Sequence, residues 1–354
     1  MTHTDNSVFV YSEYNRKKAY SAMCKASIML CLFVILSYVF DYVVVALIFG
    51  KYVDFTQAVI VRFFTLLGVP ELLSIVTVRN LITSETFYDF CVMLTVLLSM
   101  VVPSAFFAKS AKLSGEDCFT VRGKLIKGFL PTVAFCQLAI SAVLEIAYFF
   151  SGHFVSPIFS PAIAGRFLSG STALADMDIF NFVMSVIYMC VFVPFAEEFV
   201  FRGVFLTYLK RYGIAFGMVA SSLLFGIAKD DPVQATFAFG FGLMASFFVV
   251  VSGNIKTSVI CHALNNFLYF IEMYTLRTDA YVAVVVVKVI IYALGFFGLY
   301  YLVRRGGHMD VFSGKIEERD RDLVIKPGMK EVFCPPMIAF IIFYIAVFVA
   351  DMIR

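Results

Sequence analysis

The 354-residue chain has little charge and contains no tryptophan. Only 15% of its residues are charged and 61% are hydrophobic, and the mean hydropathy is +0.90. So small a share of charged residues cannot cover the surface of a compact domain in water. The composition therefore excludes a soluble globular domain and predicts an all-α, polytopic membrane protein whose main surroundings are the lipid bilayer.

The N-terminus and the cysteines carry no mark of a secreted protein. The first 22 residues are polar and basic instead of apolar, so we expect no cleavable signal peptide. The eight cysteines include no CxxC motif and lie mostly inside hydrophobic runs, which predicts small buried apolar side chains instead of a disulfide framework or a zinc knuckle. The net charge of +3 fits basic loops on one side of a membrane, and we expect no nucleic-acid partner.

Nine hydrophobic runs are candidates to cross a bilayer, which takes about 20 mostly apolar residues. These runs are residues 24–50, 87–108, 129–151, 178–207, 214–229, 232–252, 256–276, 279–303 and 334–353. A tenth run, 56–78, contains Arg62, Pro70 and Glu71, so we expect it to lie in the interface or to re-enter. The sequence thus predicts a bundle of about eight to nine transmembrane helices.

The basic residues predict the orientation of this bundle, because lysine and arginine gather on the cytoplasmic side of a membrane. They lie in residues 16–25, 109–127, 210–211 and 304–305, and at Lys256. All of these basic residues lie on the same side of the membrane only if residues 56–78 do not span it. We therefore expect a cytoplasmic N-terminus and an external C-terminus. We also expect the membrane to be that of a bacterial cell.

The predicted helices divide the chain into five parts. These are a cytoplasmic tail (1–22), N-terminal transmembrane helices with the re-entrant segment (23–152), a loop (153–177), a core domain (178–276), and C-terminal transmembrane helices (277–354) that include the mixed-charge loop 304–333.

The core domain places ionisable residues inside apolar segments, where each costs about 2.5–3.5 kcal/mol at a helix centre. Glu197 and Glu198 are adjacent in VFVPFAEEFVFRGVFL. Arg202 follows Glu198 by four residues, so the two share a helix face and are predicted to form an ion pair. Glu197 is rotated by about 100° from that pair and is free for another role.

Two later segments of the core domain bring further polar side chains. Lys229 ends the segment LLFGIAK, and HALNN contains His262 and Asn266, which project from one helix face because they are four residues apart. At a rise of about 1.5 Å per residue, each lies within the inner half of the bilayer. We therefore expect Glu197, Lys229, His262 and Asn266 to converge on a buried polar site.

The three segments together resemble the motifs of the CPBP intramembrane proteases. The matching text is EEFVFRG at 197–203, LLFGIAK at 223–229 and HALNN at 262–266, and the resemblance covers roughly 178–275. This family includes the CAAX-prenyl endopeptidases and the Abi proteins of bacteriocin processing and self-immunity. The resemblance implies a membrane-embedded hydrolase that acts on a peptide or a membrane protein.

The resemblance also implies a role for each polar residue. Glu197 would act as general base on a water molecule, with Glu198 and Arg202 supporting the helices. His262 and Asn266 would stabilise the oxyanion of the tetrahedral intermediate. In a metal version of the mechanism, a zinc ion would be held by Glu197 and His262.

One position departs from the family pattern. The family motif is FxxxH, whose histidine helps to hold the water or metal, but here Phe225 is followed by Lys229. A protonated lysine cannot ligate zinc, and beside Glu197 it would weaken that carboxylate as a base. A third zinc ligand would have to come from Asp230 or Asp231, which we interpret as caps of a turn, so a zinc enzyme is the less favoured version.

Three functions stay open on the sequence alone. The first is an intramembrane endopeptidase, and the second is a catalytically silent scaffold or regulator of a partner protein. The third is a transporter, which would need the isolated charges Asp41, Glu145 or Lys288 along its path. A closed ion pair between Lys229 and Glu197 favours the scaffold, whereas an open cavity at Glu197 favours hydrolysis.

Overall fold

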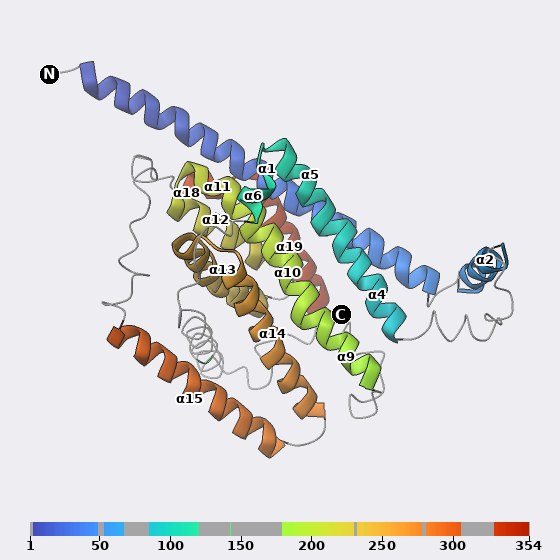
Figure 1. Cartoon of the computed structure of the whole chain (residues 1–354). Helices are drawn as coiled ribbons and strands as arrows, with labels where there is room; N and C mark the ends of the chain where they lie inside the picture. The colour runs from blue at the N-terminus through green and yellow to red at the C-terminus, as the bar shows by residue number, and fades with distance from the viewer. Residues whose placement is uncertain are drawn as a thin grey trace.

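The computed structural model describes residues 3–48, 53–66, 85–119, 142, 179–229, 232–277, 281–305 and 329–353. The elements within these ranges are helices, which lie roughly side by side in one bundle (Figure 1). Among the described residues, three helical stretches are long and apolar enough to cross a membrane: Asn15–Val44, Phe90–Ser110 and Phe182–Tyr212. The predicted all-α transmembrane bundle is therefore confirmed, and the chain is an integral membrane protein.

The first helix, α1 (His3–Ile48), is a single uninterrupted element. Its 46 residues contain neither glycine nor proline, so nothing in the segment ends the helix. At about 1.5 Å per residue it extends for about 69 Å. The polar tail predicted for 1–22 is helical from His3 onward and continues directly into the membrane-spanning part.

The short helix α2 (Val53–Leu66) covers the first part of the segment predicted to re-enter. It has 14 residues, about 21 Å, and so falls short of a hydrocarbon core of about 30 Å. The helix lies beyond the far end of α1, at the edge of the bundle (Figure 1). Residues 67–84 lie outside the described ranges, so re-entry stays a prediction.

Two long helices contain wide π-helical turns, and two of these turns, η1 (Leu97–Val101) and η3 (Tyr188–Phe192), end two residues before a proline. The first helix consists of α4 (Glu85–Val96), η1 and α5 (Val102–Ser110); the second of α9 (Ile179–Ile187), η3, α10 (Val193–Glu198), η4 (Phe199–Leu206) and α11 (Thr207–Leu209). Pro103 and Pro194 each follow a π turn closely. Proline lacks an N–H group and clashes with the preceding turn of a helix, and a wider turn relieves that clash.

A helical hairpin follows, formed by α12 (Ile214–Ile227) and α13 (Pro232–Ser252). Glycines allow its two helices to approach closely. A Cβ atom on Gly226 would lie 2.8 Å from the Ala235 carbonyl oxygen, and one on Gly242 would lie 3.0 Å from the Ser222 Cβ. The small residues thus fix the distance between two helices that flank the polar site.

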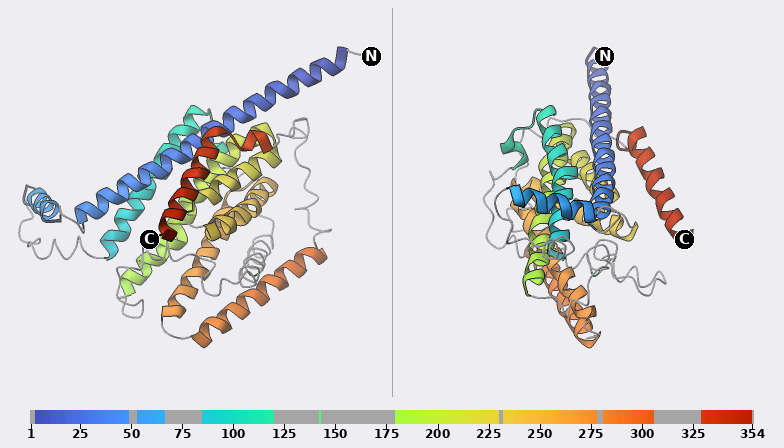
Figure 2. Two further views of the ribbon diagram at one scale, coloured as in Figure 1. Left: turned by 180° about the vertical axis from the view of Figure 1, so that it is seen from behind. Right: turned by 90° about the vertical axis from the view of Figure 1, so that its right-hand side faces the viewer.

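The remaining helices complete the bundle. They are the short α6 (Gly115–Cys118) and η5 (Lys210–Tyr212), together with α14 (Lys256–Arg277), α15 (Tyr281–Arg305), α18 (Met329–Val332) and α19 (Pro335–Ile353). Figure 2 shows α1 standing between α19 and the other helices.

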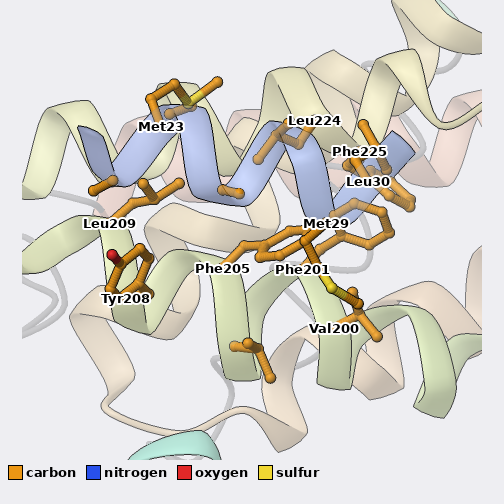
Figure 3. Packing of buried hydrophobic residues seen from close by; sticks show 14 of the residues in the cluster. Met23, Met29, Leu30, Val200, Phe201, Phe205, Tyr208, Leu209, Leu224 and Phe225 are labelled. Atoms are coloured by element: carbon orange, nitrogen blue, oxygen red, sulfur yellow. The ribbon is translucent and has the colours of Figure 1, made fainter. Parts of the chain in front are cut away.

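The main hydrophobic core joins α1 to the helices of the core domain. Met23 and Leu30 of α1 belong to one buried cluster with Phe201, Phe205 and Leu224 (Figure 3). Each of these side chains is at most 1% exposed. The N-terminal helix is therefore packed against the segment that carries the polar site.

Candidate functional site

The polar side chains of the site come from three regions of the bundle. Glu197 and Glu198 end α10, and Arg202 lies in η4, the π-helical segment that begins directly after them. Lys229 follows the end of α12, and His262 projects from α14. Long π-helical segments are rare and occur often at functional sites, so the local backbone marks this region as specialised.

Glu198 and Arg202 form a buried ion pair at the centre of the site. The Arg202 Nη1 donates to Glu198 Oε1 at 2.8 Å, and both side chains are 0% exposed. The Arg202 guanidinium also lies 4.4 Å from the ring centroid of Phe225 and 5.7 Å from that of Phe241. The ion pair predicted from their spacing is therefore present, and two aromatic faces contribute to holding the guanidinium.

The imidazole of His262 lies between the two glutamates. Its Nδ1 is 2.8 Å from Glu198 Oε1, whereas its Nε2 is 3.6 Å from Glu197 Oε2, which is too long for a hydrogen bond. Because a carboxylate oxygen accepts, we assign a proton to Nδ1. In the neutral imidazole, Nε2 then carries no hydrogen.

Lys229 forms a two-pronged ion pair with Glu197. Its ammonium Nζ donates to Glu197 Oε1 at 2.7 Å and to Oε2 at 2.8 Å. The same Nζ lies 4.6 Å from the ring centroid of Phe225. The Lys229 side chain is 13% exposed and the Glu197 side chain is 15% exposed, so the ion pair is largely buried. Together with Glu198 and Arg202, the site holds two positive and two negative charges.

Asn266 does not join this cluster, although it lies one turn beyond His262 on α14. Its Nδ2 donates to the backbone carbonyl of Met189 at 2.8 Å. In the π turn η3 a backbone N–H bonds to the carbonyl five residues earlier, as Val193 does to Tyr188. The next position is Pro194, which has no N–H, so the Met189 carbonyl loses its backbone donor and Asn266 supplies one.

The residues of the site do not fit a zinc ion. Within the described ranges, no three histidine, cysteine, aspartate or glutamate side chains lie close enough to share a metal. Of the two ligands that the resemblance implies, Glu197 has both oxygens on the Lys229 ammonium, and His262 has its Nδ1 on Glu198. A protonated amine at this place opposes a second cation. Asp230 and Asp231 lie outside the described residues.

The charges that would line a transport path cannot be placed at the site. Glu145 lies outside the described residues, and so do the side chains of Asp41 and Lys288. The transporter interpretation stays a prediction.

Sequence reasoning missed two contributors to the site. Phe241 comes from α13 and lies 5.1 Å from the His262 ring and 5.7 Å from the Arg202 guanidinium. No local pattern distinguishes it from the other 41 phenylalanines of the chain. The Met189 carbonyl was missed as well. The sequence feature that bears on it is Pro194, which lies five residues later and has no N–H group to donate to this carbonyl.

The comparisons with known proteins concern the segment that carries this site. Residues 179–268 match the family model described as type II CAAX prenyl endopeptidase Rce1-like. The match covers 90 of the 354 residues and includes the six candidate site residues: Glu197, Glu198, Arg202, Lys229, His262 and Asn266. No curated protein and no solved structure matches the chain significantly. The resemblance to the CPBP intramembrane proteases is thus confirmed, and residues 179–268 of this integral membrane protein are similar to the type II CAAX prenyl endopeptidases.

Proposed function

We propose that the chain is a catalytically silent relative of the CAAX-type intramembrane proteases, which serves as a membrane scaffold or regulator of a partner protein. The observation that carries this proposal is the ion pair of Lys229 with both oxygens of Glu197, at 2.7 and 2.8 Å. In the family this carboxylate is the base that activates water. Both oxygens of this carboxylate already accept a hydrogen bond from the ammonium group, so a water molecule would have to compete with Lys229 for them.

The expected oxyanion donors support the same conclusion. The Nδ1 of His262 is engaged with Glu198 Oε1 at 2.8 Å, so this donor is not available to an oxyanion. The Asn266 amide is engaged by the Met189 carbonyl. Base and oxyanion donors are thus all bound to groups of the chain itself, which suits a stable fold better than hydrolysis.

A proteolysis assay tests the proposal. The purified protein in detergent is incubated with a peptide library that includes prenylated CAAX peptides, beside the Glu197→Gln variant. We expect the wild type to cleave no faster than Glu197→Gln, because Lys229 already occupies the carboxylate. A soluble protease added to the same micelles serves as the control that the peptides are accessible. Cleavage by the wild type that disappears in Glu197→Gln contradicts the proposal.

A second candidate is an active intramembrane endopeptidase, and one observation favours it. The Lys229 and Glu197 side chains keep 13% and 15% exposure, and lysine has a flexible four-carbon stem. A rotation of that stem would release the carboxylate. Glu197 would then activate water, with His262 and Asn266 turned to the oxyanion after breaking their present bonds. The same assay separates the two candidates, since only the enzyme loses cleavage on Glu197→Gln.

A further inference from the structure

Two of the apolar stretches that are long enough to cross a membrane end beside each other. They are Phe90–Ser110 and Phe182–Tyr212. The Arg211 guanidinium joins their ends, because its Nη1 donates to the Ala111 carbonyl at 3.0 Å and its Nη2 donates to the Lys112 carbonyl at 3.2 Å. The helices α5, α6 and α11 meet at this end of the bundle (Figure 1). Because both apolar stretches stop here, this end lies at the level of the lipid headgroups.

Basic side chains gather where the two stretches end. Lys109 and Lys112 lie at the end of α5, and Lys210 and Arg211 lie in η5. We call these four residues the basic patch. Lys109, Lys112 and Arg211 are exposed and Lys210 is half-buried. Within the described ranges, none of the three lysines forms an ion pair, so their ammonium groups can bind an anion from outside the chain.

Two acidic residues of α6 follow the basic patch in the chain but leave its charge positive. Asp117 accepts from the Ser114 backbone N–H at 3.0 Å and from the Ser114 hydroxyl at 2.8 Å, as part of the capping box that begins α6. Glu116 is exposed beside it. Four positive charges against two negative ones leave this surface basic, so it attracts anions.

The backbone of Lys112 gives a second, independent observation. Its φ of 53° is a left-handed conformation that glycine adopts at lower cost than any other residue. The helix α5 ends around it in a Schellman motif, in which the N–H of the buried Leu113 donates to the Ala108 carbonyl at 2.9 Å. Glycine is the usual residue at the left-handed position of this motif. The lysine side chain therefore points to a role other than ending the helix.

We propose that the basic patch binds the phosphate headgroup of anionic lipids. Its four residues come from two turns that the Arg211 guanidinium holds together, so their charges act on the same headgroup. A lipid is the ligand because the patch lies where two membrane-spanning stretches end. At a membrane surface each lysine or arginine strengthens binding to anionic lipids by about fivefold. The patch contains no residue of the Glu197 site, so the inference does not depend on the proposed function.

Lipid titration followed by native mass spectrometry tests the patch. The delipidated full-length protein in detergent is titrated with phosphatidylglycerol and, in parallel, with phosphatidylcholine, whose headgroup has no net charge. We expect phosphatidylglycerol to bind more tightly, and millimolar inorganic phosphate not to displace it. Equal affinity for the two lipids would overturn the proposal. Displacement by inorganic phosphate would overturn it as well, because the ligand would then be a free anion.

The Lys112→Gly variant separates lipid binding from folding. It removes one positive charge and relieves the left-handed backbone, so phosphatidylglycerol affinity should fall about fivefold while the midpoint of unfolding in SDS mixed micelles does not fall. Lys112→Arg keeps the charge and should keep the affinity. The matched control Lys25→Gln removes an exposed charge from within the stretch Asn15–Val44 and should leave the affinity unchanged. Wild-type affinity in Lys112→Gly, or an equal loss in Lys25→Gln, would contradict the proposal.

Discussion

Replacing Glu198 by alanine should be among the most destabilising single changes in this chain. Glu198 and Arg202 are both 0% exposed, and one Glu198 oxygen accepts from Arg202 and from His262 at 2.8 Å each. The Glu198→Ala variant leaves a buried guanidinium without its partner and an imidazole N–H without an acceptor. Breaking a buried ion pair from one side costs about 3–5 kcal/mol, so we expect a loss of that size.

Two further variants show whether the charge or the packing is responsible. Glu198→Gln keeps an oxygen acceptor of similar shape, so it should cost less than the alanine variant, about 1.5–3 kcal/mol. The double variant Glu198→Leu with Arg202→Met removes both charges and fills the space with apolar groups. Such replacements of an ion pair are often neutral, so the remaining cost should be that of the His262 N–H left without an acceptor, about 1–3 kcal/mol, which is less than the alanine variant loses.

The chain lacks tryptophan, so unfolding is better followed by a buried thiol. Cys261 is 1% exposed and precedes His262 on α14. Its alkylation, resolved by peptide mass spectrometry, is measured against the fraction of SDS in mixed micelles, and the midpoints give the change in free energy of unfolding. A loss under about 1 kcal/mol in Glu198→Ala, or an equal loss in the double variant, would refute the reasoning.

Three other predictions follow from the surroundings of the site. Gly242→Ala places a Cβ 3.2 Å from the Arg202 Nη2 and should cost about 1–3 kcal/mol, whereas Gly240→Ala, with nothing within 4 Å, should be neutral or stabilising in the same unfolding assay. Asn266→Leu leaves a buried carbonyl without a donor and should cost about 1–3 kcal/mol by the same measurement, while an unchanged midpoint would contradict the structural role of this amide. Cys118 lies outside the membrane spans, and burial, followed by the Asp117 charge, raises the pKa of its thiol. Near pH 8.5 its alkylation should therefore be slower than that of a free thiol, and its rate should increase at higher pH. The folded state should lose stability as the pH rises past the ordinary thiol pKa of about 8.5, because the Cys118 thiol ionises first in the unfolded chain.

The sequence predicted the parts of the site that depend on spacing within one helix. Glu198 and Arg202 pair because four residues place them on one face. The ion pair of Lys229 with Glu197 was expected because Lys229 stands where the family motif FxxxH has its histidine. It depends on two helices that pack as the family motifs imply.

Other parts of the site depend on backbone details that spacing does not encode. The Asn266 bond arises from the π turn η3, which ends two residues before Pro194, and a proline alone does not determine whether the helix before it widens. Phe241 contacts the site from α13, so its role depends on how the hairpin packs. The polar N-terminal tail is likewise part of the continuous helix α1, because that segment contains no glycine or proline to end a helix, and hydropathy does not report this.

The most direct test of the central claim replaces Lys229. The Lys229→His variant restores the imidazole of the family motif, and Lys229→Met removes the ammonium without supplying an imidazole. If the ion pair at 2.7 and 2.8 Å silences Glu197, Lys229→His should gain peptide cleavage that disappears when Glu197→Gln is added, while Lys229→Met and the wild type stay inert. Cleavage by the wild type at the rate of Lys229→His would contradict the account.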